Sequence, residues 1–206
     1  MQNTIKKPSH ANTLYLVQLA MFVAIELIFC FTPLGSIPIS PGIVATLAHI
    51  PAIVAAIILG YNAALIVGAT MGLSALYIWT FTPPVPVVAF AFTPFAPNGS
   101  IWSLIICLVP RILFPLVTVW LFKTLKDRGP VVLRAVIAAI GGTFVHSALV
   151  LSIIYLAFNK SEVVGGNYIK FIIAWGGVNA ILEIVIAGVI AGAIIIPLIK
   201  INANKS

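Results

Sequence analysis

The chain is poor in charge, and poorest in acidic residues. Of its 206 residues, 4 are Asp or Glu and 11 are Lys or Arg, so charged residues make up 7% of the chain while hydrophobic residues make up 62%. A water-soluble domain does not need so much apolar surface, so the composition indicates an integral membrane protein. The net charge of +7 follows from the loop charges described below and requires no nucleic-acid partner.

Cysteine and catalytic motifs are also scarce. Cys30 and Cys107 both lie within apolar runs, which excludes a disulfide framework. The chain has no Walker A loop, HExxH motif or GxSxG elbow, so we expect that it is not an enzyme and does not hydrolyse ATP by the P-loop route. His49 and His146 have no further residues at metal-ligand spacing, so we expect no metal, haem or other cofactor and interpret His146 as a core residue whose hydrogen bonds are satisfied.

Long apolar runs are what the chain has in abundance. Six of them are close to the roughly 20 residues that cross a bilayer, namely residues 14–31, 43–59, 63–80, 101–122, 134–158 and 171–199. The "GYN" turn after the second run is so short that the second and third helices should form a tight hairpin. The first run is long for a signal peptide and lacks a cleavage pattern, so we expect it to be retained. We therefore predict an all-α membrane protein, a single domain over residues 1–206 with a six-transmembrane-helix bundle in residues 14–199.

The basic residues predict how this bundle is oriented. Two of those in the loops, Lys160 and Lys170, fall on one side of the predicted membrane, and the others fall on the opposite side: Lys6, Lys7, Lys123, Lys126, Arg128, Arg134, Lys200 and Lys205. The positive-inside rule then predicts that both termini, residues 1–13 and 200–206, are cytoplasmic. Loops 32–42 and 81–100 face outward, carry no charge and are rich in Pro, Gly and aromatic residues, which is typical of ordered covers over a site.

Polar side chains at membrane depth are costly, so each needs a partner or a function. Here most of them fall between the middle of the bilayer and its outer surface, which favours an outward-facing polar cavity over a continuous pore. Thr46 and His49 lie near the outer end of the predicted second helix, a helical step apart. Trp175, Asn179 and Glu183 recur every four residues, which places them on one face of the last helix.

Arg111 follows Pro110 near the middle of the fourth apolar run. Its planar guanidinium fits a carboxylate, which makes this residue a candidate anion-binding group. The alternatives are structural. The guanidinium pairs with Glu26 or Glu183, or it satisfies backbone carbonyls that Pro110 and Pro115 leave without an amide partner.

Pairs of small residues four positions apart allow helices to approach closely. Such pairs are Ala20 and Ala24, Gly68 and Gly72, and Gly188 and Gly192. At about 100° per residue, the alanine pair points roughly 140° away from Glu26. The first helix should therefore have one polar face and one small-residue face that suits another helix. Ordinary packing within the bundle is the alternative for each pair.

Several stretches resemble a known family, the S components of energy-coupling-factor (ECF) vitamin transporters. "LGSIPISPGIVATLAHIPAIVAAIILGYNAALIVGATMGL" is similar to the first outer loop and the next two helices of that family, and "FTPFAPNGSIWSLIICLVPRIL" and "NAILEIVIAGVIAGAI" are similar to its fourth and sixth helices. The resemblance covers residues 14–199. It is specific at the pattern of Thr46, His49, Ile50 and Pro51, at "PRI" around Arg111 and at the spacing of Asn179 and Glu183, and it is greatest for the pantothenate branch.

The resemblance implies the vitamin-binding subunit of an importer in a prokaryotic plasma membrane. Relatives bind the vitamin under the outer loops and work with a transmembrane coupling subunit and two ATPase subunits. They dock on the coupling subunit through an Ala-x-x-x-Ala pattern in the first helix, which Ala20 and Ala24 match. Pantothenate carries a carboxylate, an amide and hydroxyls, which suit Arg111 together with the other candidate binding residues: Thr46, His49, Trp175, Asn179 and Glu183.

Other functions remain open at this point. The same pocket would suit an S component for cobalamin, hydroxymethylpyrimidine or riboflavin, although cobalamin needs a wider opening and a pyrimidine relies more on stacking. The main rival is a self-sufficient secondary transporter, which would need no ATPase. A membrane enzyme would have to show a catalytic dyad in the folded cavity.

Overall fold

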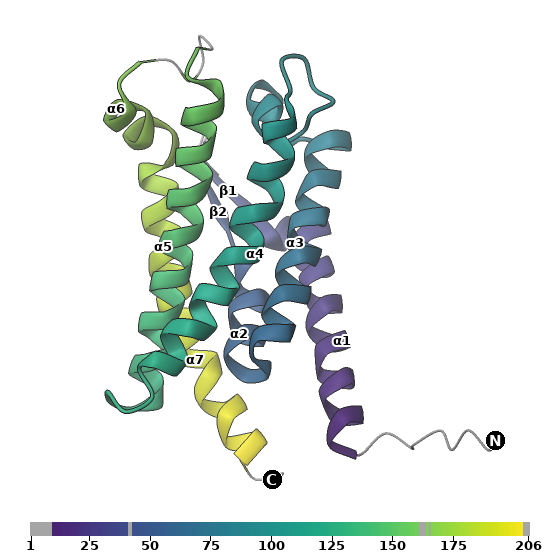
Figure 1. Cartoon of the computed structure of the whole chain (residues 1–206), viewed down its shortest axis with the longest axis vertical. Helices are drawn as coiled ribbons and strands as arrows, with labels where there is room; N and C mark the ends of the chain where they lie inside the picture. The colour runs from purple at the N-terminus through teal and green to yellow at the C-terminus, as the bar shows by residue number, and fades with distance from the viewer. Residues whose placement is uncertain (1–9, 41–42, 161–163, 165, 204–206) are drawn as a thin grey trace, which may run out of the picture.

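The computed structural model describes residues 10–40, 43–160, 164 and 166–203, and it is a bundle of roughly parallel and antiparallel helices (Figure 1). The helices are α1 (His10–Phe31), α2 (His49–Leu59), α3 (Tyr61–Phe81), α4 (Ile101–Thr124), α5 (Val131–Phe158), α6 (Tyr168–Ile172) and α7 (Val178–Ala203). Short 3₁₀ turns cover Pro33–Gly35 and Pro86–Ala91, and a π-helical turn covers Ile173–Gly177. Strands β1 (Ser36–Ser40) and β2 (Ile43–Thr46) complete the fold.

Among the described residues, α1, α3, α4 and α5 contain four stretches long and apolar enough to cross a membrane. The apolar stretches in α2 and α7 are shorter, at His49–Leu59 and Val178–Ile194. The amino end of α1 and the carboxyl end of α7 lie at the same end of the bundle, together with the α4–α5 connection (Figure 1). The prediction of an apolar helical bundle therefore agrees with the fold.

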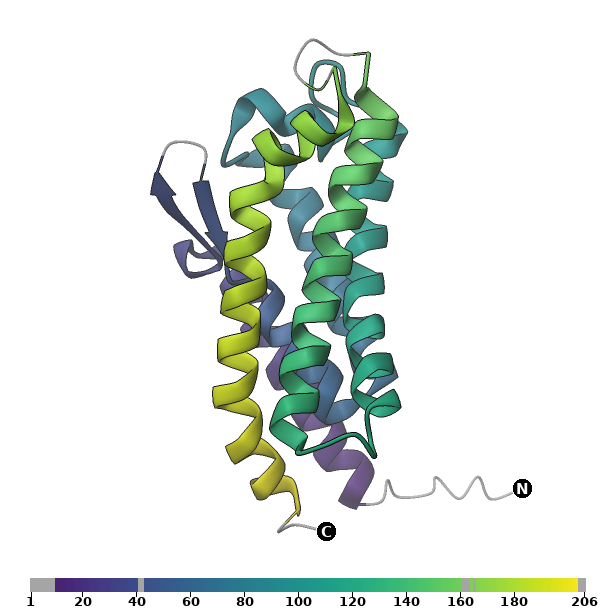
Figure 2. The same cartoon turned by 90° about the vertical axis from the view of Figure 1, so that its left-hand side faces the viewer.

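The predicted helix over residues 43–59 is wrong in its first part. Ile43–Thr46 instead forms β2, which pairs antiparallel with β1 so that Ser36 lies opposite Thr46. This hairpin lies beside α7 (Figure 2). The β-branched residues of β2 favour a strand, and a partner strand is available next to it. Thr46 and His49 are consequently not one helical step apart, because Thr46 ends the strand and His49 begins α2.

The shortness of α2 brings its first turn into the bundle. Its 11 residues span only about 16 Å. The helix occupies the half of the bundle that contains the amino end of α1 and the carboxyl end of α7 (Figure 1). Residues 49–57 are all buried. The polar residues at the start of α2 are thereby placed between the other helices instead of at a membrane surface.

The tight hairpin between α2 and α3 is confirmed. A single residue, Gly60, separates the helices and has φ +87° and ψ −160°. A residue with a side chain rarely adopts this conformation, so glycine is what allows the chain to reverse in one residue.

Close approach of α3 and α4 explains the glycine pair of α3. A Cβ built on Gly68 would lie 2.5 Å from the carbonyl oxygen of Arg111, and one on Gly72 would lie 3.0 Å from that of Cys107. The backbone of α4 therefore rests directly on the glycine face of α3. Gly188 and Gly192 of α7 pack more loosely, against the side chains of Ile140 and Val136 in α5. Both pairs thus serve packing within the bundle.

Candidate binding site

Arg111 is held in the interior of α4 by a hydrogen bond to its own helix. Its side chain is 8% exposed, and Nη1 donates to the carbonyl oxygen of Ile106 at 2.7 Å. Ile106 lies four residues before Pro110, which has no amide hydrogen to offer, so the guanidinium replaces the missing helical donor. One of the structural alternatives for Arg111 is therefore confirmed. Ile106 lies nearer than Arg111 to residues 82–100, the loop between α3 and α4, so the Arg111 side chain extends toward that end of the bundle.

The hydrogen bond to Ile106 uses only one edge of the guanidinium. Nε of Arg111 is buried and has no hydrogen-bond partner. Within the described residues, Arg111 forms no ion pair with Glu26 or Glu183, so the other structural alternative does not hold in this structure. Nε, on the edge that it forms with Nη2, is therefore left without a partner in the protein.

Aromatic residues form a wall next to Arg111. Its guanidinium carbon lies 5.8 Å from the ring centroid of Phe92, and this ring stacks on Trp79 with centroids 4.4 Å apart and an interplanar angle of 22°. A cation over an aromatic face is stabilised by the ring quadrupole. Sequence reasoning missed both aromatic residues. The aromatic content of the 81–100 loop was the only signal for Phe92, and Trp79 had none.

The loop that carries Phe92 is tied to the helix ends. The hydroxyl of Ser103 donates to the carbonyl oxygen of Phe90 at 2.8 Å, and Thr80 and Thr93 share a hydrogen bond of 2.7 Å. Cys107 donates from its thiol to the carbonyl oxygen of Phe92 at 2.9 Å. These bonds fix the loop against α3 and α4, as expected for an ordered cover.

Glu183 brings together residues from three other elements. Ser147 of α5 donates to its Oε2 at 3.4 Å, and the Thr46 side chain at the end of β2 also interacts with the carboxyl group. The charge of Arg111 in α4 lies within electrostatic reach of this carboxyl group. Two predicted site residues on distant segments, Thr46 and Glu183, are thus neighbours, and Ser147 is an additional member that sequence reasoning did not identify.

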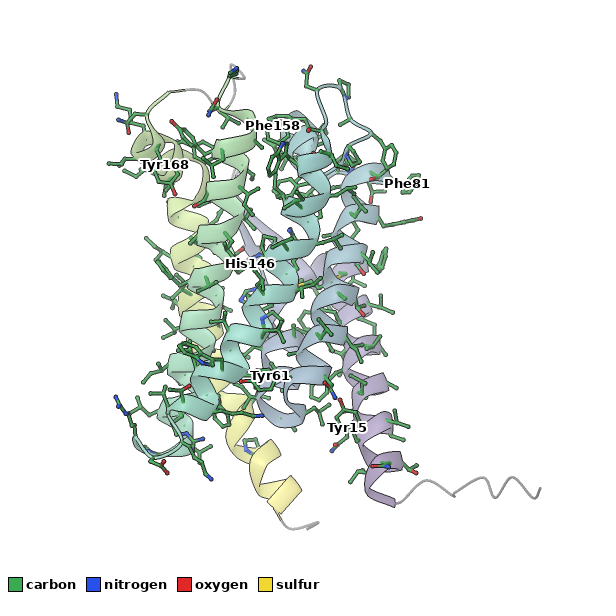
Figure 3. The ribbon with its side chains drawn as sticks, viewed as in Figure 1. Tyr15, Tyr61, Phe81, His146, Phe158 and Tyr168 are labelled. Atoms are coloured by element: carbon green, nitrogen blue, oxygen red, sulfur yellow. The ribbon has the colours of Figure 1, made fainter. Side chains whose placement is uncertain are left out.

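The two histidines lie within electrostatic reach of each other. His49 is buried at the start of α2, its imidazole lies next to the backbone of Glu183, and its Nε2 has no hydrogen-bond partner. His146, seen about halfway along the bundle in Figure 3, packs edge-on against Phe114 with ring centroids 5.1 Å apart. Its Nδ1 is also buried without a partner, so His146 is not the fully satisfied core residue we expected.

The last helix does not have the regular face that the four-residue spacing predicted. The π-helical turn over Ile173–Gly177 includes Trp175 and precedes Asn179, so the helical phase changes between these two residues. The side chain of Trp175 lies outside the described part of the structure. Asn179 and Glu183 remain one turn apart on α7, and both are partly buried.

A second group of polar atoms lies on α1 and α3. Glu26 is 0% exposed, its Oε1 accepts a hydrogen bond from the Cys30 thiol at 3.4 Å, and its Oε2 has no partner. Cys30 also interacts with Ser74 of α3 and lies within electrostatic reach of Arg111. Ala20 and Ala24 are exposed on the same helix, so α1 has the polar inner face and small-residue outer face that the helical wheel predicts.

Taken together, the described residues form an apolar helical bundle with a charged group and several half-satisfied polar groups at its interior. Polar groups at such depth require a partner or a function, so this arrangement is typical of a membrane protein with a polar site in its interior. The chain belongs to the family of substrate-specific components of ECF transporters, whose family model matches residues 14–195.

Comparisons with individual proteins agree with this family. The chain is 32% identical over 198 residues to the pantothenic acid transporter PanT of Lactococcus lactis, an alignment that covers 91% of this chain and 94% of the relative. The fold is similar to that of ThiT from Listeria monocytogenes, with a TM-score of 0.59 and 16% identity over 93% of this chain and 98% of ThiT. The resemblance to the S components of ECF transporters, including a pantothenate transporter, is therefore confirmed.

Proposed function

We propose that the chain is the vitamin-binding subunit of an ATP-driven importer and that its substrate is pantothenate. Substrate enters from outside the cell, binds between the helices beneath the 82–100 loop and is released inward after the subunit docks on a coupling subunit. Separate ATPase subunits supply the energy. The likeness to the pantothenic acid transporter PanT supports the choice of vitamin.

The observation that carries this proposal is the buried Nε of the Arg111 guanidinium, which has no hydrogen-bond partner. Nη1 is occupied by the Ile106 carbonyl and Nε is buried without a partner, so a carboxylate that approaches side-on would receive two parallel hydrogen bonds from Nε and Nη2. Pantothenate has one carboxylate. A hydroxymethylpyrimidine has none, so it would leave the Nε–Nη2 edge without a partner.

Other groups complete the proposed site. Phe92 and Trp79 form the aromatic wall, and Thr46, His49, Asn179 and Glu183 provide donors and acceptors for the amide and hydroxyl groups of the ligand. Trp175 is proposed to contact the ligand on the basis of the sequence alone. None of these residues is proposed to be catalytic, and no cofactor is required.

The proposed topology has six membrane crossings in a bacterial plasma membrane, with both termini in the cytoplasm. The common position of the first turn of α1 and the last turn of α7 supports an even number of crossings (Figure 1). Because α2 lies in the half of the bundle that contains the chain termini (Figure 1), the β1–β2 hairpin must extend through the outer half of the membrane for this segment to complete a crossing. The cluster of Lys123, Lys126, Arg128 and Arg134 around the α4–α5 connection supports the cytoplasmic assignment of that end.

Titration of the purified protein with a set of vitamins tests the proposed substrate. The protein is purified in detergent, any small molecule that co-purifies is identified by mass spectrometry, and ligand-free protein is titrated with pantothenate, riboflavin, cobalamin and hydroxymethylpyrimidine. We expect heat of binding with pantothenate alone. Binding of another vitamin in its place would overturn the assignment of substrate.

A further inference from the structure

Glu26 has a fully buried carboxyl group that the protein uses only in part. Its Oε1 accepts one hydrogen bond, a 3.4 Å contact from the weak thiol donor of Cys30, and its Oε2 accepts none. Buried acceptors are nearly always paired, since an acceptor that has lost water without gaining a partner is costly. Inside a membrane the cost is not relieved by solvent. A group from outside the folded chain, such as a bound ligand, would supply the missing hydrogen-bond partner of Oε2.

The position of Glu26 connects it with the proposed site. Cys30, one turn further along α1, contacts Glu26 directly and lies within electrostatic reach of Arg111. Ser74 of α3 interacts with the same thiol. Within the described residues, Glu26 and Arg111 form no ion pair, so neither group neutralises the other, and Cys30 is the residue that connects them.

The two unpaired atoms have complementary chemistry. Nε of Arg111 is a cationic donor, whereas Oε2 of Glu26 is an acceptor. A ligand that satisfies both must carry an anion at one end and a hydrogen-bond donor at the other. In pantothenate, the hydroxyls stand at the opposite end of the molecule from the carboxylate.

We propose that Glu26 is a specificity-determining residue that accepts a hydrogen bond from a ligand hydroxyl, at the end of the ligand remote from the carboxylate held by Arg111. This inference rests on the proposed function and extends it from the vitamin to the atoms that recognise it. It assigns the substrate class as a hydroxylated carboxylic acid. It also gives the polar inner face of α1 a role in ligand recognition, separate from the docking role proposed for the small-residue outer face of the same helix.

The test compares two ligands on three proteins. The ligands are pantothenate and an analogue in which both hydroxyls are replaced by hydrogen, and the proteins are the wild type, Glu26→Met and Arg111→Lys. Methionine has a similar length and no acceptor oxygen, so Glu26→Met should weaken pantothenate binding about tenfold, as expected when a buried hydroxyl of the ligand loses its hydrogen-bond acceptor. It should leave the affinity for the analogue unchanged. Arg111→Lys is the matched control, because both ligands carry the carboxylate and should be weakened alike.

The outcomes separate this inference from the proposed function. Titration calorimetry gives the affinities, and thermal unfolding in detergent should show that Glu26→Met is at least as stable as the wild type, because it removes an unpaired buried group. If Glu26→Met weakens both ligands equally, or neither, Glu26 has no part in recognising the hydroxyl and this inference is overturned while the proposed function stands. If the wild type binds neither ligand, the proposed function is overturned and this inference with it.

Discussion

At the scale of single residues, Arg111 is proposed to have two roles on two edges of one side chain. Nη1 satisfies the carbonyl oxygen that Pro110 leaves without its helical donor, and Nε, which has no partner in the protein, is proposed to bind the ligand together with Nη2. The structural and functional interpretations of this residue are therefore compatible. They predict different effects for different substitutions, because a single-point donor can perform only the first role.

Arg111→Lys should keep the fold and lose much of the binding. A lysine ammonium can still donate to the Ile106 carbonyl but cannot form the side-on pair of hydrogen bonds with a carboxylate. We expect thermal stability close to that of the wild type and a roughly tenfold loss of pantothenate affinity, since hydrogen bonds between charged groups contribute on the order of 1.5–3 kcal/mol. Arg111→Ala should lose as much affinity or more and also lose about 1–3 kcal/mol of stability, because the Ile106 carbonyl is then unpaired.

Arg134→Ala is a suitable control for these substitutions. Arg134 also donates to a backbone carbonyl, that of Phe122 at 3.2 Å, and lies over the Phe122 ring at 4.6 Å, but it does so at the other end of the bundle. Its loss should reduce stability without changing affinity. Unchanged pantothenate affinity in a folded Arg111→Lys protein would show that the arginine is structural only.

Much of the residue-level assignment could be read from the sequence. Proline and arginine in one apolar run predicted both the freed carbonyl and the group that satisfies it. The sequence could not predict that Phe92 stands against Arg111 or that Ser147 meets Glu183, because each pair joins elements whose relative rotation depends on tertiary packing. Apolar and small polar residues at such positions give no local signal.

At the scale of elements, the packing of α3 on α4 positions Arg111, the proposed binding residue. Gly68 lies against the backbone carbonyl of Arg111 itself, so the separation of these two helices determines where the guanidinium stands. A methyl group at Gly68 would have to displace backbone, which cannot move as a side-chain end can.

Gly68→Ala should therefore reduce both stability and binding. The added Cβ would lie 2.5 Å from the Arg111 carbonyl oxygen and 2.9 Å from Cγ of Pro115, and overpacking of this kind costs about 1–3 kcal/mol. Thermal unfolding and titration with pantothenate should show both losses. Gly188→Ala is the matched control, since its Cβ would meet side-chain atoms alone, Ile140 at 3.1 Å and Val136 at 3.7 Å, and the better helix propensity of alanine, about 1 kcal/mol, offsets the contact. Equal effects of the two substitutions would contradict this account of α3.

Element boundaries show where sequence reasoning was insufficient. Residues 43–59 read as one apolar run, but only His49–Leu59 is helical, because Ile43–Thr46 finds a strand partner in Ser36–Ser40. Apolar periodicity does not distinguish a short buried strand from a helix when the run is continuous. The π-helical turn at Ile173–Gly177 is likewise invisible to a four-residue spacing rule. Both differences change which residues face the site.

At the scale of the whole molecule, the account predicts the orientation of the chain in the membrane. Protease-accessible tags placed at the amino and carboxyl ends should be protected in intact cells and cleaved after permeabilisation, because eight of the ten loop and terminal basic residues are predicted to lie on the inner side. A tag in the 82–100 loop should show the reverse pattern. Cleavage of a terminal tag from outside would contradict the topology and the outward-facing site.

Dependence on partner subunits is predicted to rest on the exposed face of α1. Ala20→Trp or Ala24→Trp should keep pantothenate affinity near the wild-type value, because these side chains point away from the buried Glu26. A large side chain should hold a coupling helix away, so ATP-dependent uptake into liposomes containing the coupling and ATPase subunits should be lost. Gradient-driven uptake by this chain alone would instead favour a self-sufficient secondary transporter.

The central claim is that a buried arginine edge recognises the carboxylate of pantothenate, and one pair of titrations tests it most directly. Pantothenol has the structure of pantothenate with an alcohol in place of the carboxylate, so the two ligands differ only in the group that Arg111 is proposed to bind. Titration calorimetry on the purified wild-type protein should show pantothenol binding at least about tenfold more weakly than pantothenate, as expected for loss of a charge-assisted pair of hydrogen bonds. Equal affinity for the two ligands, or no binding of pantothenate, would contradict the account.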